Sequence, residues 1–104
     1  MAEFRIDPQN HIIFSKWREE KKIYLISLGF DVELVDCEPT DNSAKRIDFS
    51  SSKLTATICV WESGAIEFDA VRNSDDTLIF ADWAPETMSI EEKLDYYLDK
   101  IVTA

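Results

Sequence analysis

The chain is poor in the residues from which catalytic and metal sites are most often built. It has one histidine, two cysteines and two glycines among 104 residues. Two glycines exclude a glycine-rich phosphate-binding loop, and no G-x-S-x-G turn supports a nucleophile beside a base. His11, Cys37 and Cys59 fall in unrelated segments, which argues against zinc. We therefore expect no enzyme, no cofactor and no metal site, with His11 solvated on a helix and both thiols free and half-buried. Carboxylates alone, such as those of the SDD run at 74–76, could hold a hard cation only loosely.

Long apolar runs are also missing. No segment approaches the ~20 consecutive apolar residues of a membrane-spanning helix. The first ten residues, MAEFRIDPQN, include two acids and no apolar core of a signal peptide, so we expect a cytoplasmic protein. Scarce glycine and proline, with 45% hydrophobic residues, argue against disorder and favour a single domain over residues 1–104.

Positive charge is scarce as well. Eleven lysines and arginines face 21 acids, which gives a formal net charge of −10. The excess lies in the middle of the chain, where residues 30–88 hold 13 acids and four bases. Such a field repels nucleic acid and anionic membranes, and it attracts basic partners.

Two helices are predicted, one near each end of the chain. Asp7-Pro8 is typical of an N-cap followed by proline in the first turn, and Gly29 of a helix end, so we predict a helix over 8–28. Its charged segment KWREEKK is expected on the outer face. Ser89 and Glu92 form a capping-box pattern that starts the second helix. The apolar residues expected to be buried are Ile13, Phe14, Trp17, Tyr24, Leu25 and Leu28 in the first helix, and Ile90, Leu94, Tyr97, Leu98 and Ile101 in the second.

Five alternating runs separated by short turns predict five strands. Short connections favour antiparallel neighbours, so we predict an α+β fold of order α-β-β-β-β-β-α. A five-stranded, mainly antiparallel meander sheet would have both helices on one face, because a single sheet must hide its apolar side. The predicted strands are 30–37, 45–51, 53–61, 65–72 and 77–83.

The run ICVWESGAIEFDAV at 58–71 shows what the other face would carry. Its alternation sends Ile58 and Val60 inward and Trp61 outward, unless a one-residue bulge before the turn reverses Trp61. An exposed tryptophan surrounded by acids is typical of a protein-binding hot spot. The loop at 38–44 could contribute to the same interface. The predicted partner-binding residues are Asp31, Glu33, Asp48, Trp61, Glu67 and Asp69.

Two stretches, FSKWREEKKIYLISLGFDVEL and RIDFSSSKLTATICVWESGAIEFDAV, carry a family resemblance. With the last strand and helix, they resemble the TriTu family of bacterial immunity proteins, which occur beside polymorphic and contact-dependent growth inhibition toxins. The resemblance covers the chain from about Phe14 to Ile101. It implies an immunity protein that binds the C-terminal domain of a cognate toxin and neutralises it. The acidic middle segment favours a cationic, nuclease-type toxin, and we expect a monomer or weak dimer when the protein is free.

One alternative shares every compositional feature. An adaptor, a chaperone or a homodimer could use the bare sheet face for a different protein partner. Sedimentation of the pure protein would separate a homodimer built on that face from a monomer that awaits a toxin. The sequence does not say whether a toxin would be blocked in its active site or beside it.

Overall fold

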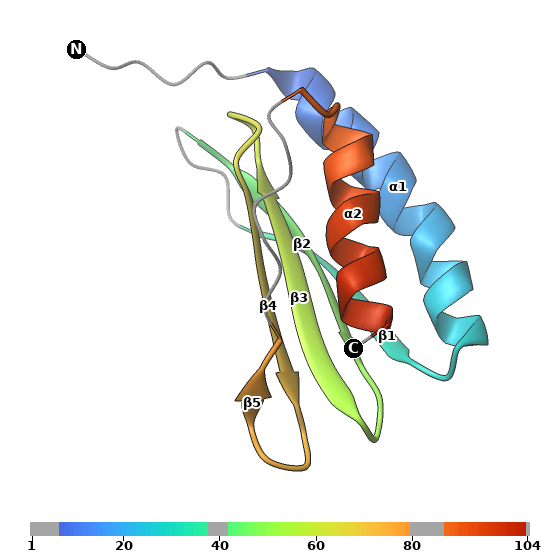
Figure 1. The fold of residues 1–104 in the computed structure, drawn as a ribbon. Helices are drawn as coiled ribbons and strands as arrows, with labels where there is room; N and C mark the ends of the chain where they lie inside the picture. The colour runs from blue at the N-terminus through green and yellow to red at the C-terminus, as the bar shows by residue number, and fades with distance from the viewer. Residues whose placement is uncertain (1–6, 38–41, 80–86, 104) are drawn as a thin grey trace.

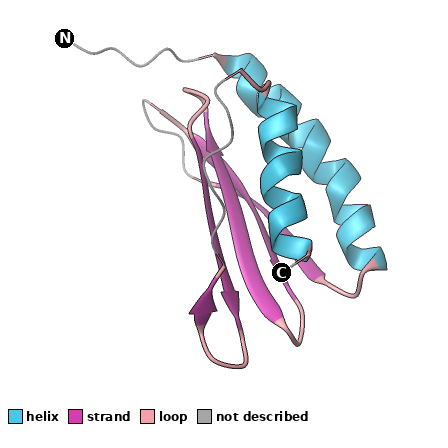
Figure 2. Cartoon of the chain, in the orientation of Figure 1, coloured by secondary structure: helices cyan, strands magenta, loops and turns pink. Residues whose placement is uncertain are grey.

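A computed structural model describes residues 7–37, 42–79 and 87–103. It confirms the predicted α+β order, with two helices and one five-stranded antiparallel sheet (Figures 1 and 2). The elements are α1 (Pro8–Ser27), β1 (Asp31–Asp36), β2 (Ala44–Ser50), β3 (Leu54–Trp61), β4 (Ile66–Arg72), β5 (Thr77–Leu78) and α2 (Ile90–Val102).

Both helices start at the predicted caps. The Asp7 side chain accepts a hydrogen bond from the Gln9 backbone N–H at 3.0 Å, directly before Pro8. In α2, Ser89 and Glu92 satisfy each other's backbone N–H groups in a capping box. Helix α1 ends one residue earlier than predicted. Its chain reversal depends on Gly29, whose φ of +93° is costly for any residue with a Cβ.

The buried face of α1 is partly different from the predicted one. Phe14, Trp17 and Leu25 are buried, but Tyr24 and Leu28 are 44% and 49% exposed. Arg18, expected on the charged outer face, is only 6% exposed. Arg18 lies one turn beyond Phe14 and two turns before Leu25, so its stem shares their face of the helix. Its long side chain reaches polar groups at the sheet, which makes an arginine acceptable there.

The sheet is a meander in the order β1-β2-β3-β4-β5 with every pair antiparallel. The register between β2 and β3 runs without a bulge from Ser50↔Thr55 to Ala44↔Trp61. Strand β5 covers only Thr77–Leu78, whereas the predicted strand ran over 77–83. Residues 80–86 lie outside the described part of the chain, and Trp83 with them.

Both helices lie on the same side of the sheet (Figure 1). Alternate residues of β2, β3 and β4 point to that side, and Ile47, Ile58 and Val60 are fully buried there. Helix α2 contributes the predicted stripe, with Leu94 and Ile101 fully buried and Ile90 partly buried against the core. Trp17 joins the two helices, because its Nε1 donates to the Asp95 carboxylate at 2.9 Å.

Candidate functional site

The side of the sheet away from the helices carries all six predicted partner-binding residues. We call it the open face, because neither described helix covers it (Figure 2). All five strands supply its side chains, which alternate with those that point toward the helices. The open face consists of Asp31, Glu33, Val35, Ala44, Arg46, Asp48, Ser50, Thr55, Thr57, Cys59, Trp61, Glu67, Asp69, Val71 and Leu78.

Three of the predicted acids line one hollow on the open face. Asp31, Glu33 and Asp48 surround a depression of about 290 Å³ on β1, β2 and β3, together with the hydroxyl-bearing Ser50, Thr55 and Thr57. Glu33 lies directly opposite Asp48 in the register, so two carboxylates share one cross-strand position. Such a hollow offers acceptors and negative charge to a lysine or arginine side chain.

The acid at the centre of the open face is already paired. Arg46 Nε donates to both carboxylate oxygens of Asp48 at 3.1 Å, and the Thr57 hydroxyl donates to Asp48 Oδ1 at 2.9 Å. The hydrogen bond to Asp48 raises the pKa of Arg46 above its usual value. Asp48 therefore contributes less free negative charge than the other four acids. Asp31, Glu33, Glu67 and Asp69 are all exposed.

Trp61 lies at the hairpin end of the open face. It is half-buried, follows the fully buried Val60, and is not part of the hydrophobic core cluster. Its register position is opposite Ala44 and diagonal to Glu67. Diagonal neighbours on a sheet lie ~7–8 Å apart, so the indole and the Glu67 carboxylate can be contacted by one partner surface.

The hairpin beside Trp61 is held by the start of α1. The Asp7 N–H and Asn10 Nδ2 both donate to the Glu62 carbonyl, at 3.1 and 2.8 Å. His11 Nε2 lies 3.0 Å from the Val60 carbonyl oxygen, which places a proton on Nε2. The prediction that His11 is a solvated helix residue is therefore wrong: it is half-buried and tied to β3. These hydrogen bonds join the start of α1 to the hairpin that carries Trp61.

Among the described residues, neither the thiols nor the carboxylates form a chemical centre. Cys37 and Cys59 are free and half-buried, as predicted. Burial raises the pKa of Cys59 to about 11, so its thiol is protonated at neutral pH and is a poor nucleophile. In the described part of the chain, no group of three His, Cys, Asp or Glu residues is placed to hold a metal ion.

Comparison with known protein families matches residues 12–100 to the family described as immunity protein TriTu. The chain belongs to the TriTu immunity protein family. The match runs from α1 into α2 and includes every strand. Immunity proteins bind toxins and are typically not catalytic, so membership confirms that this TriTu protein is not an enzyme. Neither curated proteins nor solved structures gave a match. No helix within the described ranges is long and apolar enough to cross a membrane.

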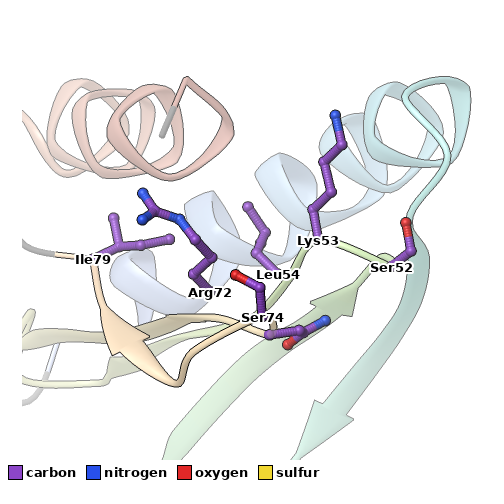
Figure 3. A pocket seen from close by; sticks show the side chains of 7 residues that line it. Ser52, Lys53, Leu54, Arg72, Ser74 and Ile79 are labelled. Carbon is purple, nitrogen blue, oxygen red and sulfur yellow. The ribbon is translucent and has the colours of Figure 1, made fainter.

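A second hollow of the TriTu protein lies on the helix side, at the far end of the sheet. It has a volume of about 340 Å³ and is lined by two cationic residues, Lys53 and Arg72, on either side of Leu54 (Figure 3). All of its polar lining side chains are exposed. This is an open surface depression, and it lies apart from the acids of the open face.

Two features of the TriTu protein escaped the sequence reasoning. Arg18 donates to the Val35 and Arg46 carbonyls at 3.2 and 3.1 Å and to Asp36 at 2.9 Å. Lys45 also binds Asp36, at 3.2 Å, and these partners hold the pKa of Asp36 below its usual value. The other missed feature is the Arg46–Asp48 pair. Their two-residue spacing on one strand was a signal for it, because such residues share a face.

Proposed function

We propose that this immunity protein neutralises its toxin by laying the open face against a positively charged surface of the toxin domain, in the cytoplasm of the cell that makes both. The toxin's surface would be the substrate site of a nuclease or a region beside it. The observation that supports the proposal best is the coincidence of two properties on one face. It lacks helical cover, and it carries five carboxylates against a single arginine.

The acidic hollow supports a specific contact. A lysine or arginine of the toxin that enters between Asp31 and Glu33 would gain two exposed carboxylates and the hydroxyl of Thr57 as acceptors. Entry would also relieve the repulsion between Glu33 and Asp48, since like charges directly opposite each other destabilise a sheet. Binding thus removes a cost that the free protein carries.

The acids on β4 support attraction over a longer range. Glu67 and Asp69 are both exposed and have no ion pair among the described residues. Strands lie ~4.8 Å apart, so the carboxylates from Glu33 on β1 to Asp69 on β4 span roughly 14 Å. A negative surface of this width accelerates encounter with a cationic partner, and salt screens the effect over ~8 Å at physiological ionic strength.

Close-range affinity would come from Trp61. Its indole offers a large apolar area at the end of the acidic face, and hot-spot residues of this type dominate binding energy within a ring of polar contacts. The hydrogen bonds from Asp7 and Asn10 to the hairpin reduce the freedom that the indole must lose on binding.

The test is the association rate with the C-terminal domain of the toxin encoded beside this protein. The double variant Glu67→Lys/Asp69→Lys should slow association by tenfold or more at low salt and flatten its salt dependence. The matched control is Glu20→Lys/Asp99→Lys, which makes the same change in net charge at exposed positions of α1 and α2. Stopped-flow fluorescence over a range of salt concentrations gives both rates.

Equal slowing by the two double variants would mean that only net charge matters, and the open face would lose its assigned role. Protection of growing cells against the toxin gives a second readout. The open-face variant should protect less well than the control at equal expression.

A further inference from the structure

The outer side of α1 exposes more apolar surface than a solvent-facing helix requires. Ile12, Ile23 and Ile26 are 59%, 74% and 52% exposed. Single exposed apolar residues are ordinary on protein surfaces, but isoleucines that recur on one face of one helix form a patch. This patch lies opposite the face that holds Phe14 and Leu25 in the core.

The patch follows a heptad spacing. Ile12, Lys16, Glu19, Ile23 and Ile26 are separated by four, three, four and three residues, which is the alternation of the two seam positions in a coiled coil. Lys16 and Glu19 are exposed, and within the described residues neither makes an ion pair or a hydrogen bond. The seam therefore has apolar ends and a central pair of opposite charges without a partner.

The first four of these residues, Ile12, Lys16, Glu19 and Ile23, have the same spacing and order in both directions, apart from the sign of the charges. When two copies of α1 lie antiparallel about a two-fold axis, Ile12 of one copy meets Ile23 of the other, and Lys16 meets Glu19. The same register places Ile26 against Gln9. Each contact occurs twice, as a two-fold interface requires. A helix that binds an unrelated partner needs no such symmetry.

We propose that the seam formed by Ile12, Lys16, Glu19, Ile23 and Ile26 is a homodimer interface, in which α1 pairs antiparallel with α1 of a second copy. Helix α1 holds four bases and two acids, a smaller net charge than that of the open face with its five carboxylates and one arginine, so two copies repel each other less through α1 than through the open face. The seam lies on the far side of the molecule from the open face, and the dimer would present two open faces outward (Figure 1).

The test uses sedimentation equilibrium of the pure protein up to millimolar concentration. Glu19→Lys alone, or Lys16→Glu alone, turns both central ion pairs into like-charge contacts and should weaken the dimer about tenfold. The double variant Lys16→Glu/Glu19→Lys exchanges the charges and should restore the dimer. Asp99→Lys is the matched control, since it makes the same charge change at an exposed residue of α2, off the seam, and it should leave the dimer intact.

Several outcomes would overturn the proposal. They are a monomer at every concentration, equal weakening by Glu19→Lys and Asp99→Lys, and failure of the double variant to recover. Circular dichroism confirms that each variant is folded. If Glu19→Lys leaves the oligomeric state unchanged but weakens toxin binding, the seam belongs to the toxin interface and a second copy is the wrong partner. The homodimer proposal and the proposed function of the open face can thus be refuted independently of each other.

Discussion

Two arginines of this protein each pair with an aspartate, and their burial predicts different costs of removal. The Arg18 side chain is 7% exposed and the Arg46 side chain 41%. Replacing each by methionine removes the charge and the hydrogen bonds and keeps most of the apolar stem. We expect Arg18→Met to destabilise the fold strongly, and Arg46→Met to leave the denaturant midpoint nearly unchanged.

The magnitude for Arg18→Met follows from its partners. Its guanidinium donates to two backbone carbonyls, of Val35 and Arg46, and to the Asp36 carboxylate. A hydrogen bond to a charged group contributes ~1.5–3 kcal/mol net, and the bond to Asp36 is worth less because that carboxylate is 61% exposed. The buried Nε of Arg18 has no hydrogen-bond partner among the described residues, and burying it destabilises the fold. Methionine removes this nitrogen, which makes the net loss of stability smaller. The expected loss is about 2–4 kcal/mol.

Urea unfolding followed by tryptophan fluorescence and far-UV circular dichroism measures both variants. The slope of the free energy against urea should be unchanged, so that a shift in midpoint reports stability alone. A loss below ~1 kcal/mol for Arg18→Met would refute the reasoning, because it would make this buried arginine equivalent to an exposed one. Equal midpoint shifts for the two variants would do the same.

Two further predictions concern Trp61 and Asp36. Trp61→Ala should weaken toxin binding by ~2–4 kcal/mol, as measured by calorimetry, and an unchanged dissociation constant in a folded variant would remove the indole from the interface. Arg18 and Lys45 hold the pKa of Asp36 below its usual value. The ionised carboxylate therefore stabilises the fold at pH values above its pKa in the unfolded chain, roughly 3.9. This contribution disappears as the pH falls through the lower pKa of the folded state. The difference in unfolding free energy between wild type and Asp36→Asn should therefore be largest at neutral pH and vanish in acid. Urea titrations at several pH values measure this difference. A difference that stays constant with pH would contradict the prediction.

The secondary structure was readable because local signals agreed with the global fold. The Asp7 cap, Gly29 and the Ser89–Glu92 capping box marked the helix limits to within one residue. Strand alternation then assigned the two faces of the sheet, and the uninterrupted register preserved that assignment as far as Trp61. Each of these signals involves residues that are close together in the sequence, and for that reason the sequence alone is sufficient to recognise them.

Long-range contacts account for what the sequence did not predict. Arg18 is buried because the ends of β1 and β2 present carbonyls and Asp36 to it, and no periodicity in α1 announces them. His11 is tied to Val60, 49 residues away in the sequence.

Arg46 shows that the open face is a compromise between folding and attraction. Carboxylates at directly opposite positions, such as Glu33 and Asp48, destabilise a sheet, and a face of acids alone would carry that cost across several strands. Arg46 and the Thr57 hydroxyl offset it at the centre by binding Asp48. The exposed acids lie at the two sides, on β1 and β4. Asp31, Glu67 and Asp69 each lie opposite an uncharged residue, whereas Glu33 faces Asp48. A surface selected only for stability would have no reason to keep them. The exposed acids at the sides are therefore the stronger indication of function, because the paired acid at the centre offers less free charge to a partner.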